Sequence, residues 1–124
     1  MKLSSTRRDM AEGIFHAMNN RDFEAFENTT TEDVSFDFPG IPQTNSKRKT
    51  ILILRSILRK YPKLQFRISE TLVENNRACV VWTNEGEDTN GNPYTNSGIT
   101  LIHFTDEKIA FISDYFKDTS FTNP

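Results

Sequence analysis

Four consecutive runs of strand-like sequence fill the second half of this chain. They are rich in β-branched and aromatic residues and cover residues 64–73, 78–87, 94–104 and 109–117. Short polar sequences such as Asn90-Gly91 lie between them and are typical of tight turns. Strands joined by tight turns pair antiparallel with their neighbours in the sequence. The pattern therefore predicts an antiparallel meander, against which the rest of the chain must pack.

The first half of the chain predicts three helices. Apolar residues at helical spacing indicate a first helix that is capped by Ser5 or Thr6 and ends near Asn19. Asp22 can cap a short second helix. A third helix is indicated over residues 46–61, where apolar residues recur every three and four positions until a proline follows.

One short strand is predicted between the second and third helices. Residues 34–38 alternate, with the apolar side chains facing inward and Asp37 outward. Residues 29–32 predict a polar turn before this strand, and residues 41–46 predict an irregular loop after it. Helices followed by a meander indicate an α+β fold, in which helices pack on one face of a curved, mostly antiparallel sheet. The length of 124 residues predicts one domain, residues 1–124.

Composition excludes several kinds of partner. The net charge of -2 combines 15 basic and 17 acidic residues, so we expect no nucleic acid partner. No run approaches the roughly 20 apolar residues that a membrane span needs, and the N-terminus has no apolar signal region, so we expect no membrane partner. The single cysteine, Cys79, lies in an apolar run that predicts a small core residue, and it suits a reducing compartment. We expect a cytoplasmic protein.

The last predicted strand carries the acid that we expect to matter most. The period of two in a strand places Asp114 on the same face as Ala110, Ile112 and Phe116. A carboxylate among apolar side chains loses hydration, which raises its pKa and suits it to proton transfer near neutral pH. The alternative is a hydrated or ion-paired carboxylate at the open mouth of a pocket.

The order of elements, together with three short sequences, resembles a known family. These sequences are Asn20-Arg21-Asp22-Phe23, Val34-Ser35-Phe36-Asp37-Phe38-Pro39-Gly40, and Lys108-Ile109 leading to Asp114-Tyr115-Phe116. The chain resembles the SnoaL-like group of the nuclear transport factor two-like superfamily, which includes polyketide cyclases, limonene epoxide hydrolase and ketosteroid isomerase. The resemblance implies a cone-shaped fold around an internal apolar pocket that takes a small hydrophobic molecule, with no cofactor.

The resemblance does not supply a complete catalytic set. Ketosteroid isomerase-like members use three polar catalytic residues. The corresponding positions in this chain hold the apolar residues Phe38, Ile14 and Ile102, so isomerisation by that mechanism is not expected. Limonene epoxide hydrolase-like members place a general acid where this chain has Asp114. The basic residue before that acid is replaced by Ser113, and the partner arginine and second aspartate have no match.

We expect the pocket to be lined from the first helix, the first strand and the meander. With Asp114 as the catalytic residue, the lining residues are expected to be Ile14, Met18, Phe36, Phe38, Trp82, Asn96, Thr100, Ile102, Ile112 and Phe116. Asn84, Asn96 and Thr100 could provide the few orienting hydrogen bonds of an apolar pocket. The run around Trp82 is apolar on both faces, so the period leaves its side open. The two histidines, His16 and His103, lie on different elements without metal-ligand spacing, and no metal site is expected.

Two functions fit these observations. The protein is either a cofactor-independent isomerase, cyclase or hydrolase that uses Asp114 as a lone acid and base, or a non-catalytic ligand-binding or dimeric accessory domain on the same fold. The outer face of the sheet is also expected to be apolar, with Cys79, Val81, Ile99, Leu101, Ile109, Phe111 and Tyr115 facing away from the pocket. Burial of that face against a second copy predicts a homodimer, with His103 at or near the contact.

Overall fold

The computed structural model describes the backbone of residues 2–118 and the side chains of residues 6–118. Its helices and strands follow one another in an order that matches the sequence pattern closely. In these residues the elements are α1 Lys2–Asn20, α2 Glu24–Asn28, β1 Thr30–Asp37, β2 Thr44–Asn45, α3 Lys47–Lys60, β3 Gln65–Glu74, β4 Arg77–Glu87, β5 Pro93–Thr105 and β6 Lys108–Phe116.

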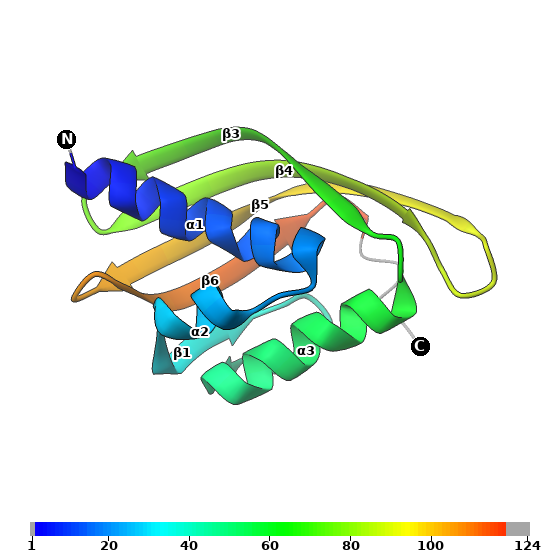
Figure 1. Ribbon diagram of the computed structural model, residues 1–124, viewed down its shortest axis with the longest axis horizontal. Helices are drawn as coiled ribbons and strands as arrows, with labels where there is room; N and C mark the ends of the chain where they lie inside the picture. Colours follow the sequence, from blue (N-terminus) through cyan, green and yellow to red (C-terminus); the bar gives the residue numbers. More distant parts are fainter. Residues whose placement is uncertain (1, 119–124) are drawn as a thin grey trace.

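The strands form one sheet in the order β2-β1-β6-β5-β4-β3. β3 to β6 pair antiparallel with their neighbours in sequence, as the predicted meander requires, while β1 pairs parallel with β6. Figure 1 shows the sheet curving around the helices, with α1 lying along β3 and β4 and α3 lying over the half of the sheet that contains β1. The prediction of an α+β fold with a curved, mostly antiparallel sheet is confirmed.

The third helix begins and ends at the residues that its sequence indicates. Ser46 is the N-cap, and its hydroxyl accepts a hydrogen bond from the backbone N–H of Lys49 at 3.1 Å. The helix stops at Lys60, with Tyr61 as C-cap, before Pro62. Its apolar stripe faces the sheet, where Leu54 is buried.

The first two helices begin at other residues than predicted. α1 already runs through Ser5 and Thr6, so neither residue caps it. α2 begins at Glu24, whose backbone N–H donates to the Asp22 carboxylate at 3.1 Å. Asp22 therefore does supply an acceptor at this end, although Phe23 occupies the cap position.

Two predictions about irregular segments were wrong. Thr30 and the three residues after it belong to β1 instead of a turn, because the chain pairs there with β6 and Thr30 lies opposite Ile109. Residues 44–45, which were expected in a loop, form the short β2 against Ser35 and Phe36. Both segments are held by pairing with distant partners, which a local pattern does not contain.

A β-bulge in β6 changes which side chains face inward near the last turn. Phe104 pairs with Ile109 and the preceding His103 pairs with Phe111, so Ala110 is one extra residue in the strand. Ile109 is consequently buried on the inner face instead of facing outward as expected. Beyond the bulge the alternation is regular again, with Ile112 buried inside.

Gly98 permits close packing at the centre of the sheet. It lies opposite Trp82 on β4 and Phe116 on β6. A Cβ atom at this position would come within 2.8 Å of the Phe116 Cα and would also collide with the Tyr115 carbonyl oxygen. Because no side chain intervenes, the rings of Trp82 and Phe116 approach to 6.3 Å between centroids.

Candidate functional site

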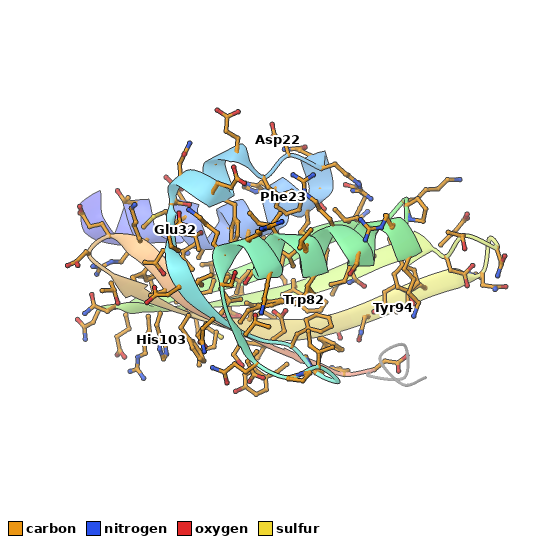
Figure 2. All side chains as sticks on the ribbon, turned by 90° about the horizontal axis from the view of Figure 1, so that it is seen from below. Asp22, Phe23, Glu32, Trp82, Tyr94 and His103 are labelled. Atoms are coloured by element: carbon orange, nitrogen blue, oxygen red, sulfur yellow. The ribbon has the colours of Figure 1, made fainter. Side chains whose placement is uncertain are left out.

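A small cavity lies between the helices and the inner face of the sheet. Its volume is about 50 Å³, enough for a few water molecules. Figure 2 shows Trp82 and Tyr94 between α3 and the sheet, on the side that the cavity occupies. The lining residues are Ile14, Phe15, Met18, Phe36, Phe38, Leu54, Ile57, Leu64, Phe66, Trp82, Asn84, Tyr94, Asn96, Ile112, Asp114 and Phe116.

The sequence-based site residues fall into two groups. One group borders the cavity together with Asp114, and it contains Ile14, Met18, Phe36, Phe38, Trp82, Asn96, Ile112 and Phe116. Thr100 and Ile102, which were also expected on the wall, do not border it. Thr100 is buried behind Trp82 and Asp114, to which its hydroxyl is bonded. Ile102 lies on the inner face but is fully buried in the core, opposite Ala78 and Ile112.

Several lining residues were not anticipated from the sequence. Leu54 and Ile57 come from α3, which was predicted as a helix but not assigned to the pocket. Phe15, Leu64 and Phe66 complete the apolar wall. The apolar spacing of α3 was the available signal, since a helix that packs on a concave sheet must close the concavity.

Seven of the sixteen lining residues carry aromatic rings. The ring centroids of Phe15 and Phe66 are 5.4 Å apart, and those of Phe66 and Trp82 are 5.3 Å apart. The ring of Phe38 lies 5.3 Å from that of Phe116. Edge-to-face and tilted contacts at these distances stabilise a rigid apolar surface. Such a wall suits an apolar ligand.

Asp114 is the only carboxylic acid among the described lining residues. It is partly accessible, and its Oδ1 accepts a hydrogen bond from the Thr100 hydroxyl at 2.6 Å. Thr100 Oγ1 in turn accepts from Trp82 Nε1 at 3.0 Å. The pKa of Asp114 is raised to about 6, mainly because burial disfavours the charged form; the hydrogen bond from Thr100 lowers the pKa and the negative charge of Asp37 raises it, both by less than burial does. An acid with this pKa can both give and accept a proton near neutral pH.

Asp37 itself faces away from the cavity, as its position in β1 predicts. It lies opposite Ser113 on β6, and the Ser113 hydroxyl donates to Asp37 Oδ2 at 3.0 Å. It acts on Asp114 only through its charge. The two carboxylates therefore do not form a catalytic pair on one surface.

The amide of Asn96 is already engaged within the protein. Its Nδ2 donates to the Tyr94 hydroxyl at 2.9 Å and to the Asp118 carbonyl at 2.8 Å. Its Oδ1 accepts from the backbone N–H groups of Ser97 and Asp118. Asn96 thus holds the end of β5 to the segment after β6 and contributes little free hydrogen-bonding capacity to a ligand. Asn84 differs, because its buried Oδ1 has no hydrogen-bond partner among the described residues.

The two histidines and the cysteine lie outside the cavity. His16 is exposed on α1, and His103 stacks on Phe111 with centroids 4.6 Å apart. Figure 2 shows His103 on the side of the sheet away from the helices. Cys79 faces outward, as its place in the strand predicts, but it is only partly buried, so the expectation of a core residue was wrong. Within residues 2–118 no cluster of three or more histidine, cysteine or acidic side chains could hold a metal ion.

The outer face of the sheet exposes large apolar side chains. Tyr115 is 59% exposed, Leu72 is 56% exposed and Ile99 is 41% exposed. Ile99 and Tyr115 lie opposite one another on β5 and β6.

In the described part of the chain, no helix is long and apolar enough to cross a bilayer.

Comparison with protein families assigns the chain. A model of the SnoaL-like domain matches residues 11–112, which include the second half of α1, the helices α2 and α3, the strands β1 to β5 and the first part of β6. The chain belongs to the SnoaL-like family. A comparison with curated proteins finds no match.

Solved structures with a similar fold agree with the assignment of this chain to the SnoaL-like family. A provisionally assigned SnoaL-like polyketide cyclase from Jannaschia sp. CCS1 superposes with a TM-score of 0.84 at 12% identity, covering 94% of this chain and 89% of its own. An epoxide hydrolase from M. tuberculosis that resembles limonene epoxide hydrolase superposes with a TM-score of 0.78 at 16% identity, covering 92% and 84%. At these identities the likeness establishes the fold alone.

Proposed function

We propose that this SnoaL-like protein binds a small, largely apolar molecule in the cavity, which must widen beyond its volume of about 50 Å³ to admit one, and that Asp114 exchanges a proton with it. The observation that carries the proposal is a single carboxyl group, with its pKa raised to about 6, on a wall that is otherwise aromatic and aliphatic apart from the amides of Asn84 and Asn96. An acid in such a setting costs stability, and perturbed carboxyl groups of this kind are concentrated at functional sites. Relatives in fold that are named as a cyclase and an epoxide hydrolase support a reaction of this general kind.

The arrangement favours a proton shuttle over activation of water. Around neutral pH Asp114 is present in both protonation states, so one group can remove a proton from the ligand and return it elsewhere. Epoxide opening by water needs a base for the water and an acid for the epoxide oxygen at the same moment. Asp114 could take only one of these two roles, and no second carboxylic acid is present among the described lining residues to take the other. We therefore favour isomerisation or cyclisation.

The experiment that tests this proposal begins with the natural ligand. Native mass spectrometry of protein purified from its own host should detect a co-purifying small molecule. The fluorescence of Trp82, which is the only tryptophan and borders the cavity, then reports its binding. Turnover of that molecule should be lost in Asp114→Asn and kept in Asp106→Asn, a control that removes an exposed carboxylate. Unchanged turnover in Asp114→Asn would contradict the assignment of the acid.

A non-catalytic binding role is the second candidate, and one observation favours it. The hydroxyl of Thr100 and the amide of Asn96, which were expected to orient a ligand, are both used within the protein. If binding is the whole function, Asp114→Asn should retain the ligand and no product should form with the wild-type protein. Conversion of the ligand by the wild-type protein would exclude this candidate.

A further inference from the structure

The two oxygens of the Asp114 carboxyl group are not equivalent. Oδ1 accepts the short hydrogen bond from Thr100 at 2.6 Å. Oδ2 has no hydrogen-bond partner among the described residues, although the side chain borders the cavity and is partly accessible. One oxygen is therefore held by the protein, and the other is open to whatever enters the cavity.

The direction of the hydrogen bonds follows from the chemistry of the groups. An indole N–H can only donate, so Trp82 Nε1 occupies a lone pair of Thr100 Oγ1 at 3.0 Å. A hydroxyl has a single proton, and the acceptor that the structure offers it is Asp114 Oδ1. Since Oδ1 is already an acceptor, a proton that binds to the carboxylate goes to Oδ2.

We propose that Thr100, itself oriented by Trp82, is a positioning residue that keeps the exchangeable proton of Asp114 on Oδ2, facing the ligand. The inference rests on the proposed role of Asp114 as acid and base. It also indicates the class of ligand, which should present an acceptor such as a carbonyl oxygen to Oδ2. When the proton moves to that oxygen, the electron pair of the O–H bond stays on Oδ2. The carboxylate that results keeps its bond from Thr100.

The strand geometry makes this chain of three residues rigid. Thr100 lies opposite Asp114 across β5 and β6, and its side chain is buried. Trp82 is 4% exposed and is packed against the rings of Phe66 and Phe116. Neither donor can turn away without leaving a buried polar group unpaired, which costs about 1–3 kcal/mol for a typical group.

Nuclear magnetic resonance of the free protein tests the proposal without any ligand. Trp82 gives the only indole N–H signal, since the chain has one tryptophan. If Thr100 connects the indole to the carboxyl group, this signal should shift with pH with a midpoint near 6, following Asp114. Thr100→Ser keeps the hydroxyl and should keep the titration. Thr100→Val removes the hydroxyl; the indole titration should be lost and the carboxyl carbon of Asp114 should titrate at higher pH than in the wild type.

Other outcomes would overturn the inference. An indole signal that stays constant between about pH 4.5 and about pH 7.5 would show that the carboxyl group and Trp82 are not connected. The same holds if the titration persists unchanged in Asp114→Asn, or if Thr100→Val leaves the titration of Asp114 where it was. These results are independent of turnover, so a failure of the proposed reaction, seen as turnover by Asp114→Asn, is distinguishable from a failure of the hydrogen-bond chain.

Discussion

The raised pKa of Asp114 predicts that this residue destabilises the protein at neutral pH. The carboxyl group has a pKa of about 6 in the folded protein, whereas an unfolded chain gives about 3.9. Between these values the folded state binds more protons than the unfolded state. The free energy of unfolding therefore falls as the pH rises through this window and stays lower above it.

The magnitude follows from the same difference. About two pKa units at about 1.4 kcal/mol each give an upper limit of about 3 kcal/mol. Asp114→Asn removes the charge but retains an oxygen that can accept the Thr100 hydroxyl. Compared with the wild type, the variant should gain about 1–3 kcal/mol of stability as the pH is raised from about 4 to about 7.5.

Urea unfolding followed by circular dichroism at several pH values measures this change. The relevant quantity is the difference in the free energy of unfolding between variant and wild type, and how this difference changes with pH. Any effect of the amide that does not depend on pH cancels in this comparison. Other groups that act on the site, Asp37 on β1 and Tyr94 on β5, are present in both proteins and cancel to first order. Asp106→Asn, in the exposed turn between β5 and β6, is the matched control. A stability difference that does not vary with pH would refute the reasoning.

Three further predictions concern the fold and the assembly. Gly98→Ala should lower the free energy of unfolding by more than about 2 kcal/mol in urea unfolding, because its Cβ would collide with β6; an unaltered midpoint would contradict the packing described. Ser46→Ala should cost about 1 kcal/mol by the same assay through loss of the cap on α3, whereas Ser56→Ala on the exposed side of α3 should cost less. We propose a homodimer through the outer face of the sheet, so Ile99→Glu should give monomers in sedimentation velocity; a wild-type protein that is already monomeric at micromolar concentration would exclude it.

The parts of the fold with a strong local period could be predicted from the sequence. α3 has a cap, an amphipathic stripe and a terminating proline, and the structure places it between Ser46 and Pro62. The meander has alternating runs with turn sequences between them, and β3 to β6 follow these runs within about two residues. The turn before β6 is built on Asp106 and Glu107, which both have positive φ values, as a two-residue hairpin turn of type I′ requires.

The segments that were wrongly predicted depend on distant partners. The first residues of β1 are polar and carry no strand pattern of their own, yet they pair with β6 almost eighty residues later. The face of Trp82 was open for a similar reason, since the run that contains it is apolar on both sides. The structure places Trp82 on the inner face, where it is buried and its indole N–H donates to the Thr100 hydroxyl.

The candidate site also combines a feature that local sequence predicts with one that it does not. The bulge at Ala110 is the reason. In a regular hairpin in which Thr105 pairs with Lys108, Thr100 would lie opposite Ser113. The extra residue shifts the pairing by one, so Thr100 lies opposite Asp114 and can donate to it. The period of two was enough to place the acid on the inner face, but the hydroxyl that orients it depends on a bulge that no turn sequence reveals.

Parallel pairing with β1 supplies the other half of the surroundings of Asp114. Phe36 lies opposite Ile112, so the ring of Phe38 reaches Phe116, and both rings join the wall beside the acid. Burial among these apolar neighbours is the largest cause of the raised pKa, because a carboxylate that loses hydration favours its neutral form. The short sequence Asp114-Tyr115-Phe116 therefore does not determine the chemistry of this acid. Its acidity is set by side chains from β1, β4 and β5, and a relative that kept those three residues but lost the bulge or the parallel pairing would carry an ordinary surface carboxylate in the same place.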